Sequence, residues 1–164
     1  MTVEQFKNDV KLVLFDFDDT LCIHSKHYNE PDLMYYSAML KGDYEWWTRR
    51  GCQINKQMGM LLDLCYRGNK RVGLLSAVDL PEAADIKLKW VSDNYKHDLE
   101  NFCTGSAGTK LIMIQAIMNV YGYEPNEILF IDDYYKNIMS AAEIGVQVMS
   151  CLEAVNLVNS ISLD

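Results

Sequence analysis

The apolar residues of this chain gather in short, nearly unbroken runs, separated by longer segments in which apolar positions recur at helical spacing. A run of about five apolar residues is too short for a helix and has no polar face, which is typical of a strand buried on both sides of a sheet. Such runs lie at residues 10–15, 71–76, 127–131 and 146–150, with a weaker one at 100–104. The pattern predicts four or five buried strands.

Helices are predicted between these strands, where apolar residues recur every three or four positions. The expected ranges are 55–66, 81–95, 110–121 and 135–144. Pro81 suits the first turn of its helix, and Thr109 is expected to cap the start of the 110–121 helix. Gly122 and Gly145 stand where two of the helices should end, because glycine readily adopts the backbone of a helix C-terminus.

Strands that alternate with helices of this length predict an α/β fold, with a Rossmann-like, doubly wound and mostly parallel sheet covered on both faces. The exception is residues 22–54, which we interpret as a small helical cap or flap inserted in a single domain spanning residues 1–164. This segment carries His24 and His27, which we expect at the surface. Its aromatic residues are Tyr28, Tyr35, Tyr36, Tyr44, Trp46 and Trp47. They are expected to pack as the cap's own core, while stacking on a substrate ring stays an alternative.

Composition narrows the class of protein. A chain of 164 residues is long enough for one domain with a full core and too short for two of ordinary size. The net charge of −8 argues against a broad basic face, so extended nucleic-acid binding is not expected. No apolar run approaches the roughly 20 residues that cross a bilayer, and the five scattered cysteines form no CxxC pair. We therefore expect a cytoplasmic protein with reduced thiols and no membrane contact.

Acidic residues follow two of the predicted strands. Asp16 and Asp18 come directly after the first strand and would project from one side if the strand geometry continued. Asp132 and Asp133 come directly after the 127–131 strand. Ligands of open α/β sheets bind beyond the carboxyl ends of the strands, so these side chains should converge. Acids so close together would repel one another unless a hard cation lay between them, and Mg²⁺ is the natural choice.

A hydroxyl and a lysine complete the candidate site. Ser76 follows the second strand and can donate a hydrogen bond to a phosphoryl oxygen. Lys110, at the start of a helix, can offset the charge of a nucleophilic carboxylate and of a transferring group. Lys87 and Lys89 are alternatives to Lys110, but both lie in an earlier crossover. Asn137 could orient Asp133 or simply lie on its helix.

The motifs DFDDTL, LLSA, TK and FIDDYYKN followed by AAEIG resemble those of the haloacid dehalogenase superfamily, in particular its phosphatase-type members with a small cap. The resemblance spans the chain except residues 22–54. It implies that Asp16 is the nucleophile and Asp18 the general acid/base, while Lys110 neutralises charge. The presence of Asp18 argues against the dehalogenases of this superfamily, which lack that acid/base.

The resemblance also implies binding roles. Ser76, with Ala77 beside it, would bind the phosphoryl group, and Thr20 would support the loop at the substrate site. The implied ligands of Mg²⁺ are Asp16, the backbone carbonyl of Asp18, Asp133 and, through water, Asp132.

The expected function is magnesium-dependent hydrolysis of a phosphate monoester, such as a small phosphorylated metabolite or nucleotide, through an aspartyl-phosphate intermediate. A nucleotide or polynucleotide-end phosphatase is a narrower version, and a phosphotransferase is a second enzymatic alternative. A catalytically silent binding module is the non-enzymatic one. A receiver domain is disfavoured because its acidic pair should follow the first strand, whereas here the Asp132–Asp133 pair comes after Lys110.

Overall fold

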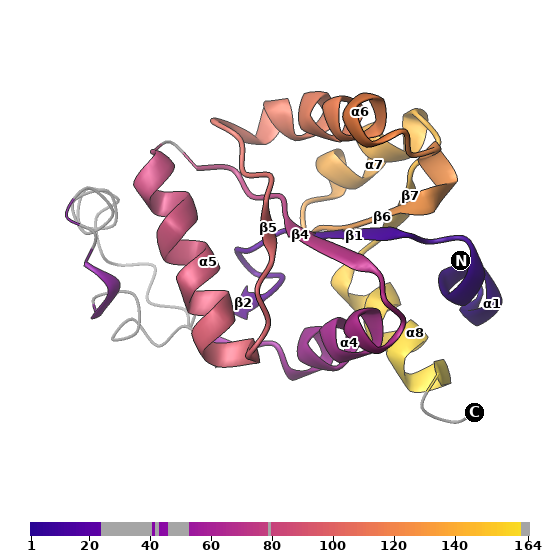
Figure 1. The fold of residues 1–164 in the computed structure, drawn as a ribbon, viewed down its shortest axis with the longest axis horizontal. Helices are drawn as coiled ribbons and strands as arrows, with labels where there is room; N and C mark the ends of the chain where they lie inside the picture. Colours follow the sequence, from indigo (N-terminus) through magenta and orange to yellow (C-terminus); the bar gives the residue numbers. More distant parts are fainter. Residues whose placement is uncertain (24–40, 42, 46–52, 79, 162–164) are drawn as a thin grey trace.

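The central element of the protein is a five-stranded parallel sheet with the order β5-β4-β1-β6-β7 (Figure 1). The computed structural model describes residues 1–23, 41, 43–45, 53–78 and 80–161. The strands are β1 (Leu12–Phe15), β4 (Arg71–Leu74), β5 (Glu100–Asn101), β6 (Ile128–Ile131) and β7 (Gln147–Met149). The structure confirms the predicted α/β class and all five strands, although each strand is shorter than the apolar run that predicted it.

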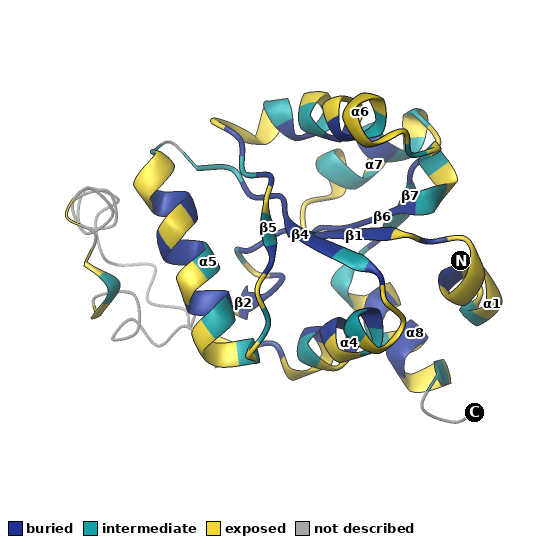
Figure 2. Cartoon of the chain, viewed as in Figure 1, coloured by how far each residue is buried: buried dark blue, intermediate teal, exposed yellow. Residues whose placement is uncertain are grey.

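Helices cover both faces of the sheet because the side chains of each strand alternate between two cores. Leu12 and Leu14 of β1 point into one core, and Val13 and Phe15 point into the other. The first core is closed by α6 (Lys110–Tyr121) and α7 (Tyr135–Glu143). The second is closed by α4 (Lys56–Arg67), α5 (Pro81–Tyr95) and α8 (Cys151–Ile161). The central strands β1 and β6 are buried along their whole length, whereas the edge strands β5 and β7 are partly exposed (Figure 2).

The strand order places a topological switch point beside β1. From β1 the chain moves outward through β4 to β5, and then returns to the other side of β1 to form β6 and β7. The carboxyl ends of β1 and β6 are therefore neighbours. The chain that leaves β1 continues towards β4, and the chain that leaves β6 continues in the opposite direction, towards β7. Crevices at such a point are where open α/β sheets bind their ligands.

The residues predicted at the helix ends lie where they were expected, although one of them makes no capping hydrogen bond. Pro81 lies in the first turn of α5, and Gly122 and Gly145 have positive φ angles of 71° and 86° at the ends of α6 and α7. Thr109 occupies the position before α6, but its side chain makes no cap to that helix. Its hydroxyl instead bonds with Ser106 across a short 3-10 turn, Ala107–Thr109, which the apolar pattern did not predict.

Two α-helices of the described residues were not predicted from the sequence. The first, α1 (Val3–Asn8), has six residues and begins with a capping box between Thr2 and Gln5, so it is too short for apolar periodicity to reveal. The second is α8, whose buried Ala154, Leu157 and Val158 do follow helical spacing. Among the helices of the described residues, none has the length and hydropathy needed to cross a bilayer.

The predicted cap, residues 22–54, is described only at its ends and at a few positions between them. At its ends β2 (Cys22–Ile23) pairs antiparallel with β3 (Gln53–Ile54), so the two chain ends of the segment lie side by side. Tyr44 is described, and its hydroxyl donates to Asp93 on α5 at 2.6 Å. His24, His27 and the other aromatic residues named above lie outside the described residues. The interpretation as a helical cap therefore stays a prediction.

Candidate active site

The loop after β1 begins with Asp16, whose backbone is still held by the sheet: its N–H donates to the carbonyl of Ile131 at 2.9 Å. The strand geometry ends there. The carbonyl of Phe17 accepts hydrogen bonds from the N–H groups of Leu21 and Cys22 at 3.0 and 2.9 Å, which closes a tight turn. The strand on which Asp16 and Asp18 were expected to project from one side therefore does not continue, and Asp18 lies on this turn, where its charge still helps to raise the pKa of Asp16.

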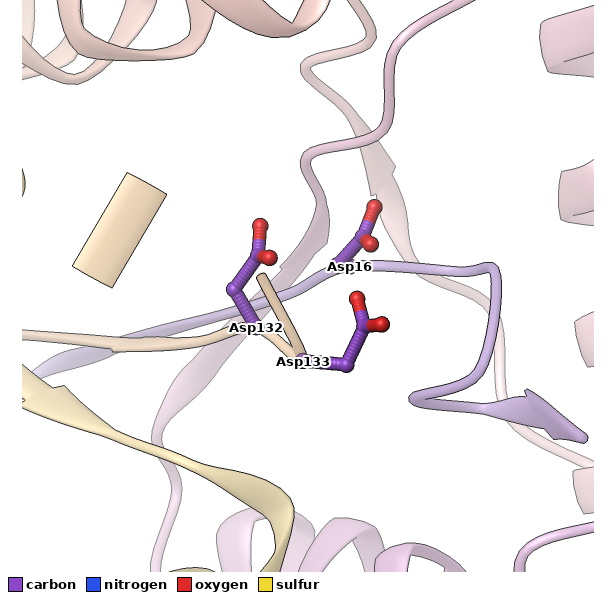
Figure 3. Close-up of side chains that lie close together, drawn as sticks. All are labelled: Asp16, Asp132 and Asp133. Atoms are coloured by element: carbon purple, nitrogen blue, oxygen red, sulfur yellow. The ribbon is translucent and has the colours of Figure 1, made fainter. Parts of the chain in front are cut away.

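Three carboxylates meet at the switch point. Asp16, Asp132 and Asp133 each offer an oxygen atom, and these atoms lie within 4.8 Å of one another. Figure 3 shows the three side chains on the adjoining ends of β1 and β6. Asp16 and Asp132 are buried, whereas Asp133 is exposed. A group of carboxylate oxygens open to solvent on one side suits a hard divalent cation such as Mg²⁺.

The electrostatics of these carboxylates also fit a cation. Burial raises the pKa of Asp16 to about 6, although the nearby Lys110 ammonium acts in the opposite direction. Burial and the neighbouring Asp132 raise the pKa of Asp133 as well. Both shifts mean that the folded protein disfavours the negative charge of these groups. A divalent cation among the three oxygens would remove that penalty.

Lys110 lies between the two buried carboxylates. Its Nζ is 2.7 Å from Asp16 Oδ1 and 2.7 Å from Asp132 Oδ2. Asp132 also accepts from the backbone N–H of Tyr134 at 2.7 Å and from Asn137 Nδ2 at 3.0 Å. Of the two possibilities left open for Asn137, orientation of Asp133 or a place on the helix alone, the structure shows neither as stated, because the side chain contacts Asp132. Burial alone would lower the pKa of Lys110, but the two carboxylates outweigh that effect and the pKa is raised.

A second buried lysine reaches the same rim of the sheet. Lys87 Nζ lies 2.6 Å from Asp18 Oδ2, 2.9 Å from Ser76 Oγ and 3.3 Å from the carbonyl oxygen of Ala77. From the sequence, Lys87 was an alternative to Lys110, whereas in the structure both lysines lie at this rim. The missed signal was its position in an apolar stripe of α5, where the buried Ala83 and Trp90 lie one helical turn away on either side.

Thr20 differs from the other candidates because its contacts are with the scaffold. Its side chain is fully buried, and its carbonyl accepts from Asn55 Nδ2 at 3.0 Å, just before α4. Its hydroxyl lies 3.6 Å from Cys151 Sγ, at the start of α8. These contacts favour the predicted support of the loop, while contact between Thr20 and a substrate stays a prediction.

Several solved structures share the fold of this chain. A HAD-superfamily hydrolase from Ehrlichia chaffeensis superposes with a TM-score of 0.59 at 17% identity, over 94% of this chain and 98% of that chain. A deoxy-D-mannose-octulosonate 8-phosphate phosphatase from Haemophilus influenzae, in a cobalt-bound form, gives a TM-score of 0.54 at 15% identity. The match covers 89% of this chain and 70% of that chain. The fold is that of the haloacid dehalogenase superfamily. A HAD family enzyme from Bacteroides thetaiotaomicron, in complex with magnesium and inorganic phosphate, matches with a TM-score of 0.50 at 20% identity, over 86% and 93%.

The similarity to known proteins found by comparison is one of structure. No family model matches the sequence, and no curated protein matches it either. At identities of 20% or less, the similarity establishes the architecture. The chemistry of this chain has to be argued from its own residues.

Proposed function

We propose that this chain is a HAD-type phosphatase, a magnesium-dependent phosphate monoester hydrolase that acts through an aspartyl-phosphate on Asp16. The proposal depends mainly on one observation: Asp16 lies at the switch point, where Lys110 Nζ is 2.7 Å from its carboxylate and two further carboxylates lie within 4.8 Å. A nucleophilic carboxylate that attacks an anionic phosphate needs positive charge on both sides. This site offers a lysine on one side and ligands for a cation on the other.

The residues of this chain divide the reaction between them. Asp16 Oδ attacks phosphorus, and the bond to the leaving oxygen breaks as Asp18 transfers a proton to that oxygen. Asp18 then takes a proton from the water that attacks the phospho-enzyme, and the bond between phosphorus and Asp16 breaks. Ser76 and Lys110 donate hydrogen bonds to the phosphoryl oxygens. Ala77 lies next to Ser76 on the same loop, where its backbone can approach the phosphoryl group.

Mg²⁺ would be held by Asp16 and Asp133, by Asp132 directly or through water, and by the backbone carbonyl of Asp18. When bound, it supplies positive charge against the approach of one anion to another. The cobalt-bound and magnesium-bound neighbours are in keeping with a divalent cation in this fold. The proposed substrate is a small phosphorylated metabolite or a nucleotide, and the proposed location is the cytoplasm.

The direct test is turnover of a generic aryl phosphate by the purified wild-type protein. We expect hydrolysis in the presence of Mg²⁺, loss of hydrolysis with EDTA, and recovery when Mg²⁺ is restored. The matched aryl sulfate should not be hydrolysed, which controls for contaminating esterases. A panel of sugar phosphates, mononucleotides and 3′-phosphorylated oligonucleotides would then define the substrate class. Failure to hydrolyse any phosphate monoester with Mg²⁺ present would contradict the proposal.

The raised pKa of Asp16 leads to a prediction about metal and pH. Because its folded-state pKa of about 6 exceeds the unfolded value, metal-free protein is stabilised by this group at low pH and loses that stabilisation as pH rises through about 6. The shift of about two pKa units corresponds to roughly 2.7 kcal/mol. Mg²⁺ competes with the proton, so the increase in melting temperature that it causes should be larger at pH 7.5 than at about pH 5.

Thermal unfolding of the wild type and of Asp16→Asn, each with EDTA and with Mg²⁺, measures this effect. The asparagine side chain does not titrate, so the metal-free variant should be more stable than the metal-free wild type near neutral pH, and the difference should shrink at low pH. An equal effect of Mg²⁺ on the melting temperatures of both proteins at all pH values would rule out Asp16 as a ligand.

A further inference from the structure

Resting on the proposed function, we infer that Lys87 is a positioning residue for the general acid/base Asp18, and that the site divides its two buried lysines between different tasks. Lys110 serves the nucleophile and the phosphoryl group. Lys87 holds the proton-transfer carboxylate in place, and its contact with Ser76 leaves the serine hydroxyl proton free to donate elsewhere.

The hydrogen-bond donors of Lys87 are all used by the protein. A lysine ammonium has three N–H bonds and no acceptor. Its three partners are Asp18 Oδ2, Ser76 Oγ and the Ala77 carbonyl oxygen, at 2.6, 2.9 and 3.3 Å. No N–H of Lys87 is left for a substrate oxygen. Lys110 donates to two carboxylates of the described residues, those of Asp16 and Asp132. Its third N–H can therefore reach a phosphoryl oxygen.

The contact with Ser76 fixes the direction of the serine hydroxyl. Because the ammonium can only donate, Ser76 Oγ must be the acceptor of that hydrogen bond. The hydroxyl proton of Ser76 therefore points away from Lys87 and is available to a phosphoryl oxygen. A serine hydroxyl can rotate, so Ser76 can still donate to a phosphoryl oxygen after Lys87 is lost, and binding of the phosphoryl group does not depend on this contact.

Asp18 depends more strongly on Lys87 than Ser76 does. Ser76 is fully buried at the end of β4, whereas the Asp18 side chain is 39% exposed on a turn. A carboxylate in that position has several accessible rotamers. The bond of 2.6 Å to Lys87 Nζ selects one of them, and misplacing a reacting group by about 1 Å can cost on the order of 100-fold in rate.

The burial of Lys87 indicates a functional role, because a buried lysine does little for the stability of the fold. Its side chain is 1% exposed, with the ammonium 5.1 Å from the centre of the Phe17 ring. Burying a lysine costs free energy even when it is paired, and an apolar side chain of similar volume often serves stability as well or better. Lys87→Met should therefore fold, and Lys87→Gln, which keeps N–H donors without the charge, provides a second variant.

Pre-steady-state kinetics separate positioning of Asp18 from contact with the phosphoryl group. An aryl phosphate with a good leaving group forms the phospho-enzyme without a proton from Asp18, because the aryl oxide departs unprotonated. Hydrolysis of the phospho-enzyme still needs Asp18 to accept a proton from water. For Lys87→Met we expect a burst of aryl oxide at the wild-type rate, followed by turnover slowed about 100-fold or more. Affinity for inorganic vanadate should be unchanged.

A double-mutant cycle provides the second readout. If Lys87 acts through Asp18, Lys87→Met should cost nothing further in an Asp18→Asn background. Lys89→Met is the matched control, since Lys89 lies on the same helix but pairs with Asp93 at the surface, and it should keep the wild-type turnover. Melting temperatures of all variants check that they fold.

The outcomes distinguish this inference from the proposed function. If the wild type hydrolyses no phosphate monoester, both are overturned. If the wild type is active and both Lys87 variants keep its turnover, only the role of Lys87 is overturned. Loss of the burst and of vanadate affinity together with turnover would also overturn it, because Lys87 would then be a ligand of the phosphoryl group.

Discussion

Asp16→Asn is expected to reduce the turnover of an aryl phosphate by on the order of 10⁴-fold or more, the scale seen when a catalytic nucleophile is removed. An amide oxygen is a poor nucleophile and a weaker ligand for a cation than a carboxylate. The fold should survive, because the asparagine oxygen can still accept from Lys110 and the backbone N–H of position 16 still donates to Ile131. The loss would therefore report chemistry rather than unfolding.

Steady-state turnover with Mg²⁺, together with a melting curve, measures this effect. Asp63→Asn is the control for the exchange of an aspartate for an asparagine, since Asp63 lies on α4 and pairs with His97. Trapping of a phospho-enzyme with radiolabelled substrate, in the wild type and not in Asp16→Asn, would place the phosphoryl group on this residue. Turnover of Asp16→Asn at the wild-type rate would exclude Asp16 as the nucleophile.

The sequence predicted the scaffold well because a parallel sheet leaves a simple pattern. Strands covered on both faces must be apolar throughout, and the runs ending at Phe15 and Ile131 are of this kind. Their adjacency follows from the topology of doubly wound sheets, and it is this adjacency that brings Asp16 to Asp132 and Asp133. The convergence of these acids was therefore predictable without any knowledge of side-chain positions.

Side-chain direction beyond the strand ends was not predictable in the same way. Asp18 was expected on the same side as Asp16 if the strand continued. Instead a turn that closes on the Phe17 carbonyl follows Asp16, and Asp18 pairs with Lys87 of α5. Lys87 was discounted because it lies in an early crossover, although sequence order says nothing about which helix face meets the rim of the sheet. An apolar stripe that contains one lysine was the available signal, and such a stripe reveals burial but not the partner.

The two lysines of the site should respond differently to removal of their charge. Lys110→Met leaves Asp16 and Asp132 facing each other in the interior, with side chains that are 9% and 0% exposed. Removing one member of a buried ionic group costs about 3–5 kcal/mol, because the remaining charges stay buried without compensation. Lys87→Met leaves Asp18, which at 39% exposed can be hydrated where it lies. We therefore expect a much smaller loss of stability for the second variant.

Urea unfolding of both variants in EDTA tests this difference. Lys110→Met should lower the free energy of unfolding by about 3–5 kcal/mol, which corresponds to roughly 6–20 °C in melting temperature for a chain of this size. Addition of Mg²⁺ should recover part of that loss, since a cation among Asp16, Asp132 and Asp133 compensates the same charges as the lysine. Equal destabilisation by the two substitutions would show that Lys110 does not compensate the buried charges of Asp16 and Asp132. No recovery with Mg²⁺ would show that a cation does not compensate them either. Recovery confined to Lys110→Met would place the lysine and the cation on one set of oxygens, which is the arrangement that the proposed phosphatase chemistry requires.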